Sequence, residues 1–327
     1  MTEKNEAFFE IQNLTVEYHS GNAIIHAVND VSLSLSQGET LGLVGETGAG
    51  KTTIARAILR ILPEHSVESV SGKVMFEGKD ILEMNARDLH DLRGRDISMI
   101  FQDPMTALNP VKTVISQIAE GYKLHHGCPQ AEANERAIKM LEMVGIGANR
   151  AYEYPHQFSG GMKQRVVIAL ALACSPKLLL ADEPTTALDV TIQAQVLDLI
   201  KDLRDELGTA MILITHDLGV VADICDKVAV IYAGRIIESG TKEDVFDHPA
   251  HPYTQGLFAA LPDLEKEVER LSPIEGLPPD PSVIRKGCDF MERCPHRCDR
   301  CTSFDNNMVE LSTGHFSRCY RTGNEEA

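Results

Sequence analysis

The sequence predicts an α/β protein in which helices cover a mainly parallel sheet. A phosphate-loop pattern runs from Gly45 to Thr52, between a strand-like segment at residues 40–44 and a helical pattern at residues 51–62. A second apolar strand, residues 178–182, leads into two consecutive carboxylates. Strand and helix signals then alternate as far as residue 232, which is typical of a parallel sheet with helical crossovers.

The phosphate loop follows the pattern G-x-x-x-x-G-K-[ST], whose glycines let backbone N–H groups close around phosphates at the start of a helix. In such a loop the Lys51 ammonium reaches the β- and γ-phosphates, and the Thr52 hydroxyl binds magnesium. The alternative is a tight glycine turn with a solvated lysine, which the order of strand, loop and helix disfavours. We expect ATP to contact Gly45, Glu46, Thr47, Gly48, Ala49, Gly50, Lys51, Thr52 and Thr53.

Asp182 and Glu183 stand at the carboxyl end of the second strand, where an α/β sheet places its ligands. We expect Asp182 to hold magnesium, directly or through water. We expect Glu183 to act on the attacking water as general base or orienting group. An acidic strand end with solvated carboxylates is the alternative.

The net charge of −17 disfavours non-specific binding to nucleic acid or anionic lipid, because such binding uses Lys and Arg to neutralise phosphates. It argues against a DNA-repair ATPase, although a local basic patch is compatible with it. The longest apolar run, Val166 to Cys174, is far shorter than the ~18 to 20 residues needed to cross a bilayer. Residues 1–6 lack the features of a secretory signal, so we expect a cytoplasmic location.

Two regions accompany the phosphate loop. Residues 11–18 and 31–35 alternate apolar and polar side chains, as the half-buried strands of an antiparallel β flap do. Residues 111–147 have apolar positions at helical spacing. We therefore expect a helical subdomain at about residues 105–162.

The composition changes near residue 250, after which proline becomes frequent. Residues 277–281 have the pattern of an extended linker. We place one domain at residues 8–250 and a small carboxy-terminal extension at residues 251–327.

Cysteines are concentrated in this extension. Of eight in the chain, five fall in the last 40 residues: Cys288, Cys294, Cys298, Cys301 and Cys319. In a reducing cytoplasm, clustered cysteines suggest a metal more than disulfides. The extension is therefore expected to bind metal.

With these motifs in place, residues 8 to about 250 resemble the nucleotide-binding subunit of an ATP-binding-cassette (ABC) transporter. Ser159-Gly160-Gly161 matches the signature of that family, which caps the ATP bound on the opposite subunit. The resemblance implies that Ser159 and the amides of both glycines contact the γ-phosphate there. Phe158 and Met162 depart from the commonest form, which has leucine and glutamine at these positions.

Four further positions match the family. Gln102 resembles the Q-loop glutamine, which senses magnesium and water, and His216 resembles the switch histidine, which contacts the γ-phosphate and holds Glu183. Asp189, in Ala187-Leu-Asp189, resembles the D-loop aspartate, and Tyr18 resembles the aromatic residue that stacks on adenine. The alternatives are a surface glutamine, a structural histidine, a helix N-cap and a packed strand tyrosine.

The segment from His248 to Thr254, together with the cysteines, resembles a narrower group, the ATPase subunits of dipeptide and oligopeptide importers. Phe158 and Met162 are normal in that group. Some members hold a [4Fe–4S] cluster through four thiolates, and the matching positions here are Cys288, Cys294, Cys301 and Cys319. Tetrahedral zinc suits four thiolates equally, and reduced spectator thiols are a further alternative. Cys298 lies outside the family set and forms a C-x-x-C pair with Cys301.

The resemblance implies a peripheral ATPase, at the cytoplasmic face of the membrane, that powers peptide uptake with ATP and Mg2+. Its expected partners are two multispanning permease subunits, a second related ATPase or another copy of itself, and indirectly an extracytoplasmic peptide-binding protein, with no nucleic acid. The alternatives are an importer of nickel or another small solute, and a soluble regulatory ABC ATPase. A third interpretation makes the tail a redox-responsive binding module and the ATPase activity secondary.

Overall fold

The computed structural model describes residues 8–186, 188–260 and 274–323. The amino-terminal segment considered above as a signal, and Ala187 of the predicted D-loop, lie outside the described residues. The described residues group into two compact units. The phosphate-loop unit takes in the chain up to residue 34, residues 41–82 and the chain from residue 215 onward. The helical unit takes in residues 35–40 and 83–214.

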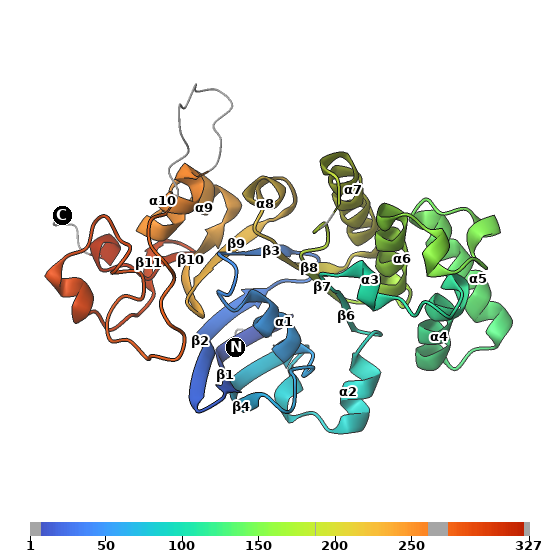
Figure 1. The fold of residues 1–327 in the computed structure, drawn as a ribbon, viewed down its shortest axis with the longest axis horizontal. Coiled ribbons are helices and arrows are strands. Elements are labelled where there is room, and N and C mark those ends of the chain that lie inside the picture. Colours follow the sequence, from blue (N-terminus) through green and yellow to red (C-terminus); the bar gives the residue numbers. More distant parts are fainter. Residues whose placement is uncertain (1–7, 187, 261–273, 324–327) are drawn as a thin grey trace, which may run out of the picture. The chain divides into compact units, whose positions relative to one another are not determined.

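The predicted antiparallel flap forms one sheet of the phosphate-loop unit, with strand order β2-β1-β4-β5 (Figure 1). In β1 the buried side chains alternate on each side of an irregularity between Gln12 and Thr15, with Phe9 and Ile11 before it and Leu14 and Val16 after it, so the period-two pattern holds within each part of the strand. The strands are β1 (Phe9–Ser20), β2 (Ala23–Leu35), β4 (Val67–Phe76) and β5 (Lys79–Asp80).

A second series of strands in this unit runs in the order β11-β12-β10-β9-β3. β3 and β9 are parallel, whereas β10, β12 and β11 continue in antiparallel pairs. The cysteine-containing extension supplies β11 and β12, which the sequence did not predict because runs of four and three residues carry too little periodicity. The bounds are β3 (Thr40–Val44), β9 (Lys227–Tyr232), β10 (Arg235–Thr241), β11 (Val309–Ser312) and β12 (His315–Ser317).

The helices of this unit are α1 (Lys51–Ile58), α8 (Leu218–Ile224), α9 (Lys242–Asp247) and α10 (Pro252–Ala259). α1 buries Ile54, Ala55 and Ile58, as its helical spacing predicted. It ends before the expected residue 62, because Arg60 adopts a left-handed φ of 52° just ahead of Pro63.

The helical unit contains three parallel strands in the order β8-β7-β6. Every residue of these strands is buried, which agrees with their continuous apolar sequences. They are β6 (Ile97–Ile100), β7 (Leu178–Asp182) and β8 (Ala210–Ile214). The parallel strands in both units confirm the predicted fold class, while the antiparallel strands after β9 make the sheets more mixed than expected.

Six α-helices are described in the same unit, and α4, α5 and α6 pack against one another (Figure 1). They are α2 (Ala86–Leu92), α3 (Pro104–Ala107), α4 (Val114–His126), α5 (Gln130–Met143), α6 (Gly160–Leu172) and α7 (Val190–Leu207). Asn85 caps α2 and Ser159 caps α6, each through its side-chain oxygen.

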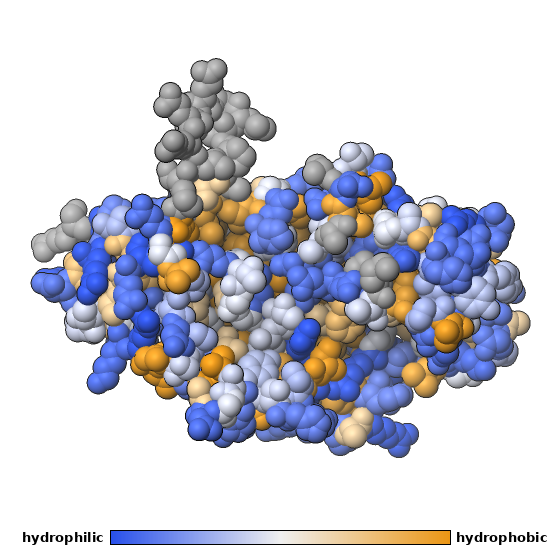
Figure 2. Space-filling model, viewed as in Figure 1, coloured by the Kyte–Doolittle hydropathy of each residue, from blue (hydrophilic) through white to orange (hydrophobic). Residues whose placement is uncertain are grey.

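In the part of the chain that the structure describes, none of the helices has both the length and the apolar character needed to span a bilayer. Figure 2 shows a visible face that is mostly hydrophilic, with hydrophobic residues in small separate groups.

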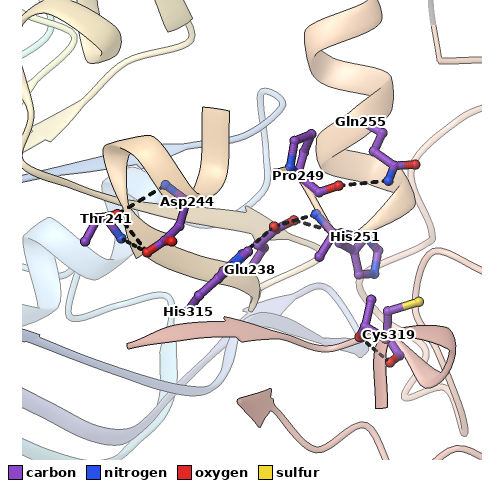
Figure 3. A network of polar contacts seen from close by, with 10 residues as sticks. Glu238, Thr241, Asp244, Pro249, His251, Gln255, His315 and Cys319 are labelled. Carbon is purple, nitrogen blue, oxygen red and sulfur yellow. Dashed lines mark hydrogen bonds and ion pairs between the residues drawn. The ribbon is translucent and has the colours of Figure 1, made fainter. Parts of the chain in front are cut away.

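A buried carboxylate connects the extension to the rest of the phosphate-loop unit (Figure 3). Glu238 on β10 is completely buried and accepts a hydrogen bond from the Nε2 atom of His315 on β12 at 2.9 Å. It also accepts the backbone N–H groups of Ala250 and His251 at 2.7 and 2.8 Å. One carboxylate thereby joins β10, the chain leading into α10, and β12.

Replacing Glu238 by Ala is expected to destabilise the protein by about 3 to 5 kcal/mol, because a buried imidazole and two buried N–H groups lose their partner. Urea unfolding of the purified chain measures this. Glu243→Ala, an exposed position on the neighbouring α9, is the control and should cost well under 1 kcal/mol. Equal stabilities of the two variants would contradict the role assigned to Glu238.

Candidate nucleotide-binding and hydrolysis site

The phosphate loop, residues 45–50, joins the buried strand β3 to α1. A Cβ atom on Gly45 would meet the carbonyl oxygen of Ile231, and one on Gly50 would meet that of Ala27. Gly50 also has a φ of 105°, which side-chain-bearing residues rarely adopt. The two glycines therefore let the loop pass close to the backbones of β9 and β2.

Lys51 begins α1 and is almost completely buried. Its Nζ atom donates hydrogen bonds to the carbonyl oxygens of Gly45 at 2.8 Å and Glu46 at 3.0 Å. The ammonium thus lies over the loop, at the positive end of the helix dipole, where an anion is stabilised. Thr52 and Thr53 follow in the first turn and are half-buried. This arrangement suits the predicted binding of phosphates.

In the helical unit, Glu183 follows the last residue of β7, the buried Asp182. Its carboxylate accepts hydrogen bonds from Gln102 Nε2 at 2.8 Å and Thr186 Oγ1 at 2.9 Å. Its backbone has a left-handed φ of 46°, and its N–H donates to the carbonyl of Ile214 at 2.8 Å. Such a conformation is costly for a residue with a side chain and is concentrated at functional sites.

The structure thus brings Gln102 and Glu183 together, although they are 81 residues apart in sequence. Gln102 is an exposed residue after β6, and Asp182 lies at the end of the neighbouring strand β7. Two carboxylates and an amide oxygen are ligands that Mg2+ accepts. Their predicted roles toward magnesium and water stay predictions.

His216 is an exposed residue that follows β8 in sequence, as the switch-histidine motif requires. The next residue, Asp217, caps α8 by accepting the N–H groups of Gly219 and Val220 at 2.9 and 3.3 Å. A second hydrogen bond, from the N–H of Asp217 to Thr215 Oγ1 at 3.0 Å, fixes the turn. The turn thereby holds the backbone of His216 between two anchored neighbours.

The signature lies at the start of α6. Ser159 caps the helix by accepting the N–H of Met162 at 3.4 Å, and Gly160 and Gly161 begin the first turn. A Cβ atom on Gly161 would meet the Ile192 side chain of α7. The sequence Ser-Gly-Gly therefore places exposed backbone groups at a helix start, which suits contact with a phosphate.

Both positions at which the signature departs from the commonest form contact Arg150. The guanidinium lies 4.5 Å from the centre of the Phe158 ring, and its NH1 atom is 3.1 Å from the Met162 sulfur. It also donates to the carbonyl of Gln157 at 3.1 Å and forms an ion pair with Glu153 at 2.7 Å. One arginine therefore braces both sides of the signature.

The two remaining predicted contacts are less distinctive. Asp189 stands at the N-cap position of α7 without a side-chain capping bond, so the capping alternative does not account for its side chain. Tyr18 is half-buried on β1, opposite Val67 of β4. This position fits either strand packing or stacking on a base, so the role of Tyr18 stays a prediction.

Sequence reasoning missed three residues at these sites. Thr186 binds the Glu183 carboxylate. Tyr253 and Arg293, both from the predicted extension, contact Glu46 of the phosphate loop at 3.0 and 2.8 Å. No local pattern indicates these contacts, because the partners of Glu46 are 207 and 247 residues away.

Cys288, Cys294, Cys301 and Cys319 line a common pocket with Phe290 and His251. Burial raises the pKa of Cys288 to about 12 and also raises the pKa values of Cys294 and Cys319. In contrast, a hydrogen bond with Cys301, whose sulfur lies 3.6 Å away, lowers the pKa of Cys298.

A shared pocket lined by four thiols fits a group held by four thiolates in its donor chemistry. Among residues 8–186, 188–260 and 274–323, however, no three His, Cys, Asp or Glu side chains converge as ligands of a metal ion. The prediction that the extension binds metal is therefore not supported by the geometry.

Residues 277–281, predicted to be an extended linker, are mostly exposed. Residues 277–281 form no helix or strand, but Pro281 accepts the N–H of His26 on β2 at 2.9 Å. Together with the phosphate loop, residues 278–281 line one cavity. The segment is therefore irregular and mostly exposed, as predicted of a linker, and it also contacts β2 through Pro281.

Comparisons with known proteins agree with these motifs. A family profile described as "ABC transporter" matches residues 28–186, and one described as "Oligopeptide/dipeptide transporter, C-terminal region" matches residues 237–301. The dipeptide transport ATP-binding protein DppD of Bacillus subtilis is 45% identical over 96% of this chain and 95% of its own length. The oligopeptide transport ATP-binding protein OppD of Salmonella typhimurium is 48% identical over 95% of this chain and 93% of its own.

Solved structures extend the similarity to the fold. A dimeric ATP-binding cassette in a post-hydrolysis state with ADP and Pi has a TM-score of 0.64 and 28% identity, and covers 72% of this chain and 98% of its own. The cbiO1 protein of Clostridium perfringens, part of an ABC transporter complex, has a TM-score of 0.63 and 28% identity, and covers 74% of this chain and 91% of its own.

The contacts of Arg150 predict that Arg150→Ala loosens the signature without affecting the phosphate loop. Amide hydrogen exchange of residues 157–162 should become faster, because the carbonyl of Gln157 and the side chains of Phe158 and Met162 lose a shared partner. Exchange of residues 45–53 is the internal reference, and the exposed Arg87→Ala is the control variant. Unchanged exchange at residues 157–162 would contradict the bracing role.

Proposed function

Because this chain belongs to the oligopeptide and dipeptide importer family of ABC transporter ATPases, we propose that it hydrolyses ATP to power the uptake of dipeptides or oligopeptides through a membrane importer. The observation that carries the proposal is the near full-length similarity to peptide-transport ATP-binding proteins, which includes the region beyond the cassette. The ATPase domain is proposed to span residues 8–250, with the extension at residues 251–327.

In the proposed reaction, the phosphate loop binds the triphosphate through its backbone N–H groups, and Lys51 neutralises charge on the β- and γ-phosphates. Thr52, Gln102 and Asp182 are each assigned to a magnesium ion, which would supply charge neutralisation at the triphosphate. Glu183 takes or directs the proton of the attacking water. Its hydrogen bonds from Gln102 and Thr186 support this role, because they fix the direction of the carboxylate.

Other residues complete the proposed site. His216 is assigned to the γ-phosphate and Tyr18 to the adenine. Ser159, Gly160 and Gly161 are assigned to the ATP of a partner cassette, and Asp189 to communication between cassettes. The helix start at Ser159 supports the signature assignment, and the dimeric form of a similar cassette supports the need for a second subunit.

The proposed assembly has this chain at the cytoplasmic face of the membrane, bound to two multispanning permease subunits. The second cassette is a related ATPase or another copy of this chain. Peptide reaches the permease from an extracytoplasmic binding protein, so this chain moves its cargo without touching it.

We further propose that Cys288, Cys294, Cys301 and Cys319 hold a [4Fe–4S] cluster, with zinc as the alternative. The proposal rests on the donor chemistry of these four thiols and on the family resemblance, and Cys298 is not among the residues that line their pocket. Cys301 and Cys319 are buried and Cys288 and Cys294 are half-buried; all four would have to lose their protons to bind metal, which an Fe or Zn ion promotes.

Replacing Glu183 by Gln is expected to lower kcat for ATP by ~10²- to 10⁴-fold, the usual contribution of a general base. Nucleotide affinity should be retained, because the phosphate-loop contacts are unchanged. Steady-state hydrolysis and equilibrium ATP binding, measured on the assembled transporter, separate the two effects. Glu135→Gln, at an exposed site on α5, is the matched control. Near-normal hydrolysis by Glu183→Gln would refute the assigned role.

Anaerobic purification is expected to yield about four iron and four sulfide per chain with visible charge-transfer absorption. Cys294→Ser should abolish this content, whereas Cys298→Ser should retain it. Zinc without sulfide would instead indicate the alternative, a zinc ion bound by the four thiolates. A chain that contains neither metal after reconstitution would contradict a metal-binding role for the extension.

A further inference from the structure

Glu46, the second residue of the phosphate loop, forms hydrogen bonds through its carbonyl oxygen, its N–H group and its carboxylate. Its carbonyl oxygen accepts a hydrogen bond from Lys51 Nζ at 3.0 Å, and its N–H donates to the Tyr253 hydroxyl at 3.0 Å. Its carboxylate accepts two hydrogen bonds from Arg293, at 2.8 and 2.9 Å. Two of the three partners come from beyond residue 250, so the region after the cassette acts directly on the loop.

Several other contacts hold the side chain of Arg293 in place. Its side chain is only 6% exposed, and its Nε atom donates to the carbonyl of Glu275 at 3.0 Å. Its NH1 atom lies 3.3 Å from the Tyr232 hydroxyl, and its guanidinium lies over the rings of Tyr232 and Phe290. These contacts immobilise the arginine independently of Glu46. The bidentate pair with Glu46 therefore costs little further side-chain entropy.

The charge of Glu46 explains why the loop needs such a partner. A carboxylate carried by a phosphate-binding loop opposes the approach of a polyanion, and this repulsion is strong where water is partly excluded. Arg293 neutralises the carboxylate and, through two parallel hydrogen bonds, fixes its direction. Lys51 contacts the carbonyl of the same residue, so the position of Glu46 also affects the position of the lysine.

We propose that Arg293 is a positioning residue for ATP binding, which holds the phosphate loop in its binding conformation through Glu46. Tyr253 supports the same residue from its N–H group. The carboxy-terminal region therefore contributes to the nucleotide affinity of the cassette. This inference rests on the proposed function in one respect, namely that the phosphate loop binds ATP.

The test is a double-mutant cycle on the full-length chain, with Mg2+ and a non-hydrolysable ATP analogue titrated by calorimetry. Arg293→Ala should weaken binding ~10- to 100-fold, because it removes two charge-assisted hydrogen bonds and leaves the carboxylate uncompensated. Arg293→Lys should fall between it and wild type, since an ammonium keeps the charge but not the bidentate geometry. The exposed Arg297→Ala is the control and should bind like wild type.

The decisive variant is Arg293→Ala combined with Glu46→Gln. If the arginine acts by neutralising and directing the carboxylate, removing that charge should recover part of the lost affinity. A purely structural role predicts that the double variant binds no better than Arg293→Ala. Thermal unfolding and metal content, measured on every variant, identify any loss that comes from misfolding of the extension.

Affinity of Arg293→Ala within twofold of wild type, or no recovery in the double variant, would overturn the inference while leaving ATP binding by wild type intact. A wild-type chain that does not bind the analogue would overturn the proposed function together with the inference. The two failures are therefore distinguishable in one experiment.

Discussion

The geometry of the phosphate loop is the constraint on which the rest of the phosphate-loop unit depends. A phosphate-binding loop must direct several backbone N–H groups at one anion. Its glycine-containing backbone has few side chains that could stabilise this arrangement. Here the surroundings stabilise the loop. It follows the buried strand β3, and glycines at positions 45 and 50 let it lie close to the backbones of β9 and β2. Lys51 donates a hydrogen bond to the carbonyl oxygen of Gly45 in the loop. Glu46 then ties it to the carboxy-terminal region.

The helical unit shows the same logic at Glu183. A glutamate with a φ of 46° is strained by about 1 to 3 kcal/mol and persists only where its surroundings hold it. The N–H bond to Ile214 fixes its backbone, and Gln102 and Thr186 fix its carboxylate. The strain is compensated by neighbours that also keep the carboxylate in one direction, which suits a group that must act on a water molecule.

Local patterns predicted much of this molecule, because strand, loop and helix at residues 40–62 are encoded within a few turns of chain. The parallel strands and the residues of the phosphate loop could be predicted for that reason. The bidentate pair between Glu46 and Arg293 could not, since its partners are 247 residues apart and neither position has a distinctive pattern. Likewise, β11 and β12 are too short to show periodicity, and the hydrogen bond from His26 to Pro281 joins positions far apart in the chain.

The central claim is that ATP hydrolysis by this chain powers peptide import, and uptake by intact cells tests it most directly. Cells with and without the chain would be supplied with labelled di- and oligopeptides and, in parallel, with nickel. The account predicts that peptide uptake is lost without the chain and restored by the wild-type protein, while nickel uptake is unchanged. Normal peptide uptake in cells that lack the chain, with loss of nickel uptake, would contradict it.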